Sequence, residues 1–431
     1  MKYNIFTLLS QDGPFATGDQ PSGNRTFSPE SRAWVIHLKE SNMASRYRVV
    51  RNQIFDLLDV HSFGDIKRLI KDKSRQSAVD LRAFKLLGNM FGIEGNDREI
   101  VSRVQSYSRT ADNVIRYLQG KIFANYATYI EMTNEISATN SPVQLLLTIF
   151  DDRYSKKARF EAKRKLILLN LAGSIDQRER ETEVENKFAQ FLDFLNEYVW
   201  SKEAKIGELE VVYLLSTHDR ENFACTDVKV IEQDRISELT RNPGQKLTVI
   251  KRRRFISYGR QIPIYVSVRK KPPEVKVLKL LRKGEENPAV AVDDELGLMA
   301  VLDSAVDVKI FHRHLTQSAI KADSFMTLEE VSDTLTGGMR PPGNIGSSSL
   351  TPMFKFFARM GGMRVEFIVH TNKSYLNYMY QRDISHDEYE VKRIFDSGVA
   401  DLLFPQNIYA LDMKQIRNEL ICWFRKRNEE S

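Results

Sequence analysis

Hydrophobic residues change their spacing near residue 202 of this chain. Before that point, apolar residues recur every three or four positions, as in Phe188, Phe191, Leu195 and Val199, which is typical of helices with one buried face. After it, apolar and polar residues alternate in GELEVVYLLSTHD, DVKVIEQD, KLTVIKRRRFISYG and RQIPIYVSVRKK, separated by turn signals such as NPG and YGR. The pattern predicts a helical domain over 46–201 and a mixed α+β domain over 202–431, preceded by an irregular arm over 1–45.

Within the second domain, the pattern predicts further elements in chain order. EVKVLKLLRKG reads as a helix that ends at Gly284, and LGLMAVLD as a strand. We expect a helix near TLEEVSDTL, then a loop over TGGMRPPGNIGSSSL, then two strands in FKFFARMGGMRVEFIVHT joined at Gly361 and Gly362. Helices over about 373–395 and 410–427 complete the prediction.

Composition excludes several classes of protein. The 431 residues are 42% hydrophobic, which excludes a disordered or fibrous chain. The two cysteines, Cys225 and Cys422, are too few for a disulfide framework, so a reducing compartment fits best. No apolar run approaches the length that spans a bilayer, and the N-terminus lacks a signal-peptide pattern. We therefore expect a cytoplasmic protein with no membrane partner.

Positive charge is concentrated in one window. The net charge is +7, yet residues 246–283 alone carry thirteen Lys and Arg residues and one acid, Glu274. Such a cluster suits a polyphosphate or an RNA backbone, and a solvated basic surface explains it equally well. We expect Lys251, Arg252, Arg253 and Arg254 as the candidate RNA contacts.

Acidic residues flank two of the predicted strands. Asp293 and Asp294 precede LGLMAVLD, and Glu366 lies within VEFIV. If these strands pair, a carboxylate from each can reach one site, where substrate phosphates would complete the coordination of Mg²⁺. Without that pairing, carboxylates near strand ends are more often turn or surface residues.

Other familiar site patterns are absent from the sequence. It contains no Ser-His-Asp order, HExxH, P-loop or GxGxxG, and His312 and His314 lack the partners of a zinc site, so a structural role is expected for both. Aromatic residues and histidines gather after Glu366, a density that indicates packing or base stacking: His370, Tyr375, Tyr378, Tyr380, His386 and Tyr389.

Taken in order, these segments resemble the synthetase domain of the RelA/SpoT family, pyrophosphokinases that make alarmone nucleotides. RKKPPEVKVLKLLRKG resembles the stretch that grips the donor ATP and puts Arg269, Lys271 and Lys279 on its phosphate-binding positions. DELG resembles the strand that opens with the metal aspartate, here Asp294. VEFIVHT resembles the strand that carries the second acid, here Glu366.

The helix that follows carries the family's H-x-x-Y pattern as His386 and Tyr389. The resemblance covers about residues 205–400 and implies a nucleotidyltransferase-like mixed sheet flanked by helices. It implies Mg²⁺-dependent transfer of pyrophosphate from ATP to a 3′-hydroxyl, with Asp294 and Glu366 as catalytic and metal-binding residues. Arg269, Lys271, Lys279, His386 and Tyr389 would then contact the nucleotides.

Several positions depart from the family pattern. Ser347 and Thr351 replace the Tyr and His of a G-Y-x-S-L-H segment whose Tyr stacks on the acceptor base, and Met299 replaces an Arg. Loss of the stacking residue leaves the acceptor open between GDP or GTP, ATP, and a tRNA 3′ end as in toxin-like relatives. The same departures favour an alternative, a catalytically degenerate fold that acts as a nucleotide sensor or an RNA-binding module. The first 200 residues lack the pattern of the family's hydrolase domain.

Overall fold

The computed structural model describes residues 44–200, 209–240, 242–292, 294–335 and 351–430. The chain has the expected mixed α+β class, with one eight-stranded mixed sheet and helices around it. The described part of the N-terminal half, 44–200, contains helices and turns but no strand, as predicted. The predicted arm falls almost entirely outside the described residues, as does the predicted domain boundary at 201/202, so both stay predictions.

Contacts divide the chain into two compact units that are not contiguous in sequence. The helical unit comprises Met1–Glu181, Pro272–Val292 and Arg393–Arg417. The sheet unit comprises Thr182–Lys271, Asp293–Lys392 and Asn418–Ser431. The helices α14 (His386–Asp396) and α17 (Met413–Glu430) therefore contribute residues to both units.

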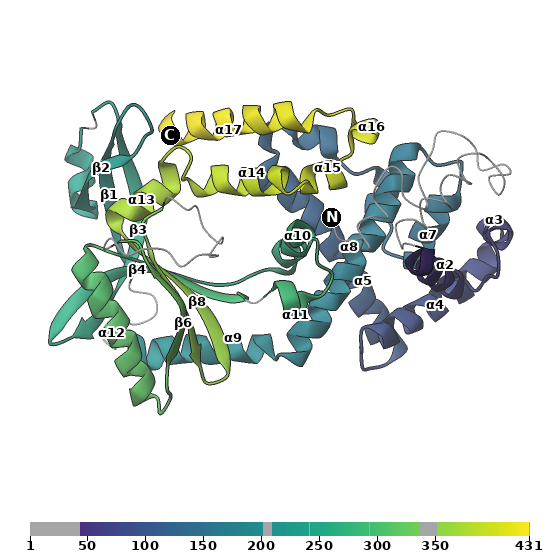
Figure 1. Cartoon of the computed structure of the whole chain (residues 1–431), viewed down its shortest axis with the longest axis horizontal. Helices are drawn as coiled ribbons and strands as arrows, with labels where there is room; N and C mark the ends of the chain where they lie inside the picture. Colours follow the sequence, from purple (N-terminus) through teal and green to yellow (C-terminus); the bar gives the residue numbers. More distant parts are fainter. Residues whose placement is uncertain (1–43, 201–208, 241, 293, 336–350, 431) are drawn as a thin grey trace. The chain divides into compact units, whose positions relative to one another are not determined.

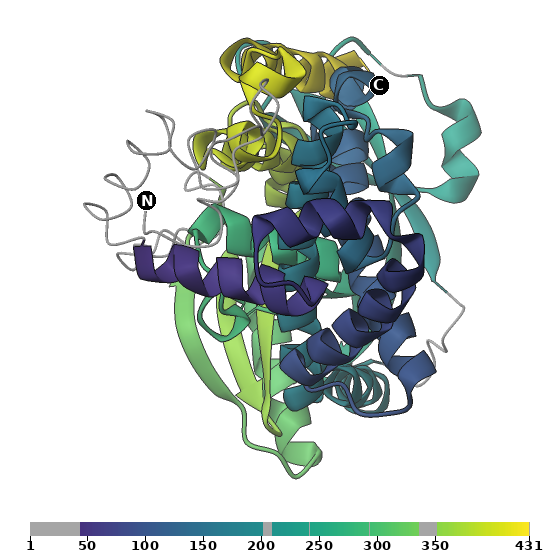
Figure 2. The same ribbon diagram turned by 90° about the vertical axis from the view of Figure 1, so that its right-hand side faces the viewer.

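The helical unit is organised around one long helix, α8 (Lys156–Glu181), which packs against α5, α7 and α10. Figure 2 shows the purple and blue helices α2 to α5 packed together. The other elements of this unit are α2 (Ala44–Leu58), α3 (Phe63–Lys71), α4 (Lys73–Met90), α5 (Asp97–Tyr117), η3 (Leu118–Ile122), η4 (Ala124–Ile130), α6 (Asn134–Ser137), α7 (Pro142–Phe150), α10 (Pro273–Lys283), α11 (Pro288–Ala291), α15 (Val399–Leu403) and α16 (Gln406–Tyr409).

The predicted helix of the basic window is α10. Left-handed Gly284 ends it, as the sequence predicts, and a proline at its first position suits the start of a helix. Lys276, on its buried face, donates a 2.6 Å hydrogen bond to Glu179 of α8. One lysine of the basic window therefore anchors this helix within the helical unit.

Buried charges hold the segment around α15 and α16 onto α8. The Arg164 side chain is only 1% exposed, and its Nη1 donates to the Leu403 carbonyl and to the Tyr409 hydroxyl, each at 2.7 Å. The Tyr409 hydroxyl in turn donates to Glu161 Oε1 at 2.8 Å. Because buried ions are costly when unpaired, each member of this network depends on the others.

We expect Arg164→Met to destabilise the chain by about 3–5 kcal/mol, because it leaves Glu161 buried without its nearest cation. Urea unfolding followed by far-UV circular dichroism measures the change. Arg109→Met, on the exposed face of α5, is the matched control and should stay within about 0.5 kcal/mol of the wild type. Equal stability of the two variants would contradict the proposed role of the network.

The sheet unit contains strands in the order β2-β1-β3-β4-β5-β8-β7-β6. Figure 1 labels β1 to β4, β6 and β8 of this sheet. All neighbours are antiparallel except β5 and β8, which are parallel. The strands are β1 (Glu210–His218), β2 (Cys225–Glu232), β3 (Gln245–Ser257), β4 (Arg260–Lys270), β5 (Leu296–Leu302), β6 (Thr327–Asp333), β7 (Phe354–Met360) and β8 (Met363–Thr371). The remaining elements of the unit are α9 (Val184–Phe194), η5 (Leu195–Val199), η6 (Gln233–Glu238), α12 (Ala305–Lys321) and α13 (Asn372–Tyr380).

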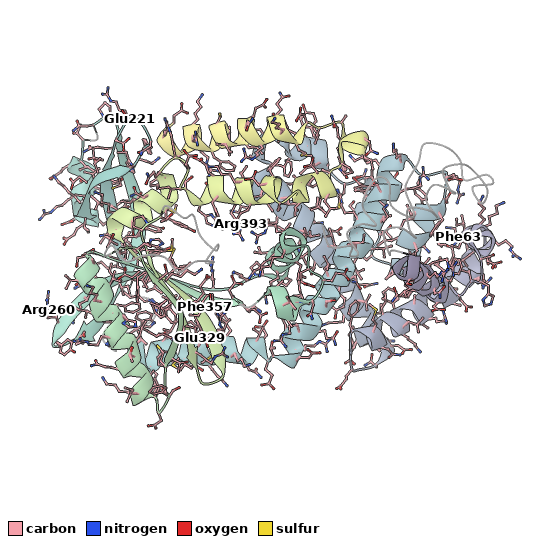
Figure 3. The ribbon with its side chains drawn as sticks, viewed as in Figure 1. Phe63, Glu221, Arg260, Glu329, Phe357 and Arg393 are labelled. Atoms are coloured by element: carbon pink, nitrogen blue, oxygen red, sulfur yellow. The ribbon has the colours of Figure 1, made fainter. Side chains whose placement is uncertain are left out.

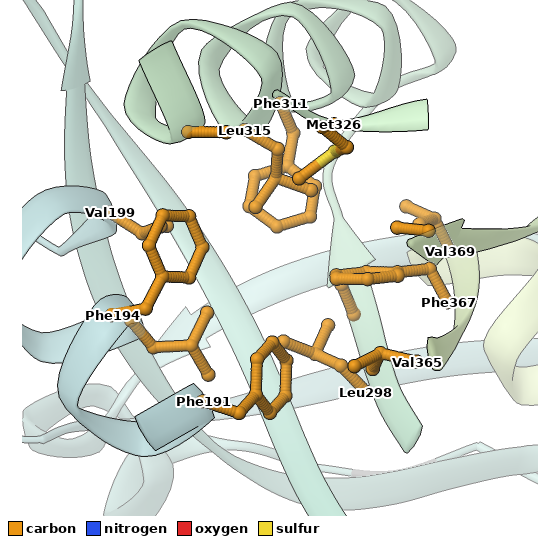
Figure 4. Close-up of a cluster of buried hydrophobic side chains, with 14 of the residues drawn as sticks. Phe191, Phe194, Val199, Leu298, Phe311, Leu315, Met326, Val365, Phe367 and Val369 are labelled. Carbon is orange, nitrogen blue, oxygen red and sulfur yellow. The ribbon is translucent and has the colours of Figure 1, made fainter. Parts of the chain in front are cut away.

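Helices cover the two faces of the sheet differently. Phe191 of α9 and Phe311 of α12 enter the main core on one face, where they join Leu298 of β5 and Phe367 of β8 (Figure 4). Tyr375 and its neighbours on α13 cover part of the opposite face. Alternation along β8 therefore places Phe367 in the core and Glu366 on the face that α13 only partly covers.

The predicted helix near TLEEVSDTL is wrong, because this segment forms β6. Leu328 and Val331 are three residues apart, a spacing that imitates a helix face. The segment instead pairs with β7, and Arg359 Nε donates to Glu329 Oε1 at 2.8 Å across the strand pair. Cross-strand pairing, which spacing cannot show, decided this element.

Two helical regions also differ from the sequence prediction. The sequence prediction does not include α12, because polar residues such as His314 interrupt its apolar spacing. The His314 side chain is nevertheless buried, and its Nε2 lies 2.8 Å from the Val199 carbonyl oxygen. The single helix predicted over about 373–395 is two helices, α13 and α14. The helix predicted over about 410–427 is α17.

Candidate functional site

Three neighbouring strands bring Arg269 and Glu366 onto one face of the sheet. Arg269 of β4 lies opposite Gly297 of β5, which lies opposite Glu366 of β8. Residues directly opposite each other in a sheet point to the same face. The pairing of β5 with β8, on which the sequence prediction of a common site depended, is therefore present.

Gly297 makes room for the contact between these two side chains. A Cβ atom at this position would lie 3.2 Å from Arg269 Nε and 3.6 Å from the Glu366 carbonyl oxygen. Because Gly297 has no side chain, Arg269 reaches across β5, and its Nη2 donates to Glu366 Oε2 at 3.2 Å.

Glu366 is a buried carboxylate with two cationic partners. Its side chain is 6% exposed, and its Oε1 accepts a 2.9 Å contact from Nζ of Lys355, a buried residue of β7. Lys355 pairs with Ile368 in the ladder, so it reaches Glu366 diagonally. Lys355 is not among the residues that the sequence pattern indicates, although a lysine among phenylalanines in FKFFARM is a signal of a buried ion pair.

Asp294 and Lys271 form the second ion pair of the site. The Lys271 backbone N–H donates to the Glu295 carbonyl at 2.9 Å, which holds the end of β4 beside the start of β5. Its ammonium group contacts Asp294 Oδ2. Burial lowers the pKa of Lys271, whereas the carboxylates of Asp294 and Glu366 oppose that shift.

The structure thus brings together four of the sequence-predicted residues and adds a fifth. We call this set the charge cluster: Arg269, Lys271, Asp294, Lys355 and Glu366. Three of its members are cations and two are carboxylates, so its net charge is +1. In the same row of the sheet, Phe357 of β7 lies opposite Glu366, and Glu329 of β6 lies opposite Phe357. Figure 3 labels Phe357 and Glu329 on these neighbouring strands.

Tyr378 links the charge cluster to the predicted aromatic residues. Burial is the main cause of its raised pKa; the charge of Arg269 opposes this shift, and the charge of Glu366 adds to it. Its ring lies 5.3 Å from that of His386, centroid to centroid. His386 therefore lies one aromatic contact away from the cluster, and Tyr389 is half-buried further along α14.

The other predicted site residues are placed elsewhere or lie outside the description. Lys279 is half-buried on α10 of the helical unit, and its role in binding ATP stays a prediction. Asp293 and Ser347 lie outside the described residues. Met299 packs against an apolar cluster with α13, and Thr351 is buried.

Three of the four candidate RNA contacts have partners inside the sheet unit. Arg252 lies 3.4 Å from Asp303, and Arg254 lies 3.2 Å from Glu210, measured between the charged atoms. The Arg253 guanidinium lies over the Trp200 ring at 5.7 Å. Lys251 is exposed. The charges of Arg252 and Arg254 are therefore paired with acids inside the sheet unit, and RNA contact stays a prediction.

The donor set fits a metal ion that is shared with a ligand. The described residues contain no group of three or more His, Cys, Asp and Glu side chains arranged for a metal. Asp294 and Glu366 supply two carboxylates, which is the number that proteins commonly offer Mg²⁺ when substrate phosphates supply further oxygens. The cluster therefore fits Mg²⁺ bound together with a phosphate ligand.

Comparison of this chain with protein-family models, curated proteins and solved structures finds no match. Among the described residues, no helix has both the length and the apolar content to cross a membrane.

His370, four residues after Glu366 on the same face of β8, gives the sheet unit a pH-dependent stability. Its imidazole is fully buried, and burial lowers its pKa to about 4. The unfolded chain takes up this proton near its ordinary pKa of about 6.5, so stability decreases as the pH falls below that value.

We expect the wild type to lose about 2 kcal/mol more stability than His370→Phe between about pH 7.5 and about pH 5. Urea unfolding at both pH values measures this difference. The other buried histidines are present in both proteins, so the comparison isolates His370. An equal change of stability with pH in the two proteins would show that protonation of His370 does not cause the pH dependence.

Proposed function

We propose that the charge cluster is the active site of a Mg²⁺-dependent pyrophosphokinase that transfers pyrophosphate from ATP to a 3′-hydroxyl. The observation that carries the proposal is the meeting of two carboxylates and three cations on, or just beyond the ends of, adjacent strands of the sheet. Cations at fixed positions can bind several phosphate oxygens at once, and carboxylates beside them can share a metal with those oxygens. The finer fold that we propose is nucleotidyltransferase-like, with β4, β5, β8 and β7 as the site-bearing strands.

Each side chain has a stated role in this proposal. Arg269, Lys271 and Lys355 bind the triphosphate. Asp294 and Glu366 hold Mg²⁺, which when bound neutralises charge on the transferred group.

The acceptor oxygen bonds to the β-phosphorus while the bond from that phosphorus to the oxygen bridging the α- and β-phosphates breaks, and AMP leaves with that oxygen. Glu366 accepts the proton of the 3′-hydroxyl. Most of the rate enhancement then comes from positioning and charge neutralisation.

The acceptor is a nucleotide (GDP, GTP or ATP) or the 3′ end of tRNA. Tyr378, His386 and Tyr389 are the candidate contacts for its base, because Tyr378 lies near the charge cluster and His386 lies against Tyr378. Aromatic rings of this kind stack on nucleobases.

A second candidate function is a nucleotide sensor or RNA-binding module that lacks catalysis. Two observations favour it. Met299 packs in an apolar cluster where the resembled family has an arginine, and Thr351 is buried where that family has a histidine. The sensor would use the same three cations to bind phosphate.

We expect Glu366→Gln and Asp294→Asn each to reduce transfer of label from γ-labelled ATP by about a hundredfold or more, because each change removes a charged ligand and keeps the shape of the side chain. The assay contains Mg²⁺ and, in separate reactions, GDP, GTP, ATP or bulk tRNA. Label on a nucleotide or on tRNA identifies the acceptor.

Glu329→Gln is the matched control, because Glu329 lies two strands away in the same row and pairs with Arg359 and Arg364. It should leave transfer unchanged. Nucleotide binding by the wild type without transfer to any acceptor would favour the sensor. Full activity of the folded Glu366→Gln protein would refute the site assignment.

A further inference from the structure

The charge cluster neutralises its own carboxylates when no ligand is bound. Glu366 contacts Lys355 through Oε1 and Arg269 through Oε2, and Asp294 contacts Lys271 through Oδ2. A divalent metal at Glu366 would have to share or displace both of its cationic partners. It would also raise the net charge of the cluster from +1 to +3.

Burial makes this increase in positive charge unfavourable. The Lys355 and Glu366 side chains are 7% and 6% exposed, so water screens their charges poorly. Arg269 can turn toward solvent, because 48% of its side chain is exposed, whereas the side chain of Lys355, the second residue of β7, is almost wholly buried. Lys355 is therefore the residue that most strongly opposes a metal at Glu366.

We propose that the charge cluster is an anion-gated metal site, in which a polyphosphate binds without metal and only then makes Glu366 available as a metal ligand. The phosphate oxygens attract Arg269, Lys271 and Lys355 away from the carboxylates. The same oxygens reverse the excess positive charge and complete the coordination of the metal. Lys355 thus pairs with Glu366 before the polyphosphate binds and contacts the polyphosphate afterwards. This proposal rests on the proposed function for its choice of metal ligands.

Two binding measurements on the full chain test the order of binding. Mn²⁺ replaces Mg²⁺ as the probe, and its electron paramagnetic resonance signal reports the free ion during titration of the protein without phosphate. Isothermal titration calorimetry in EDTA reports binding of inorganic tripolyphosphate without metal. We expect tripolyphosphate to bind under these conditions and Mn²⁺ alone not to bind. Binding of Mn²⁺ alone, or failure of tripolyphosphate to bind without metal, would overturn the gate.

The variant Lys355→Met tests the role of the lysine. Methionine keeps the length and apolar stem of the side chain and removes the charge that competes with a metal. We expect the affinity for Mn²⁺ without phosphate to rise by about tenfold or more, and the affinity for tripolyphosphate to fall. The double variant Lys355→Met/Glu366→Gln should lose the gained Mn²⁺ binding, which would place the metal at Glu366.

The matched control is Arg364→Met. Arg364 lies on the same sheet face and carries the same charge, but it pairs with Glu329 and Glu330. An equal gain of Mn²⁺ binding in this variant would show an effect of net charge alone and would overturn the role of Lys355. Should Lys355→Met not fold, the two wild-type titrations still decide the order of binding.

These measurements use neither ATP nor turnover, so they separate the gate from the proposed function. If the protein binds tripolyphosphate without metal, does not bind Mn²⁺ alone and transfers no label, the anion-gated metal site is supported and the pyrophosphokinase activity is refuted. If the protein transfers label and binds Mn²⁺ without phosphate, the pyrophosphokinase activity is supported and the anion-gated metal site is refuted.

Discussion

The parallel pairing of β5 with β8 sets the register on which the candidate site depends. It places Gly297 between Arg269 and Glu366, so that a missing side chain on the middle strand lets the outer two meet. A shift of β8 by one residue would turn Glu366 into the core and Phe367 out of it. The core around Phe367 therefore fixes the position of the carboxylate, because a shift would take the aromatic ring out of the core and place a carboxylate there without its cationic partners.

The β7–β8 turn sets the second half of the site. Gly361 and Gly362 both have positive φ, and they join strands whose first paired residues are Met360 and Met363. A two-residue turn of this kind matches the twist of the strands and allows little freedom in register. It therefore determines that Lys355 lies diagonally across from Glu366.

Both units contain buried charged side chains, but the ratio of cations to carboxylates differs between them. Around Arg164 in the helical unit, carboxylate, hydroxyl and carbonyl oxygens hold one segment of chain onto α8. In the charge cluster the cations outnumber the carboxylates, and Arg269 remains half exposed. An excess of partly accessible positive charge is suited to an anionic ligand, whereas a closed network is suited to holding the fold together.

The sequence by itself determined the type of most elements, the α+β class and the residues with charge to contribute, because these depend on local spacing and composition. Alternation identified the strands around Arg269 and Glu366, and Gly284 marked the end of α10. Only the tertiary structure decided that β6 is a strand, that Lys355 joins Glu366, and that Arg252 and Arg254 pair with nearby acids. Each of these depends on which strands are neighbours and in what register, and that is set by packing between residues far apart in the chain.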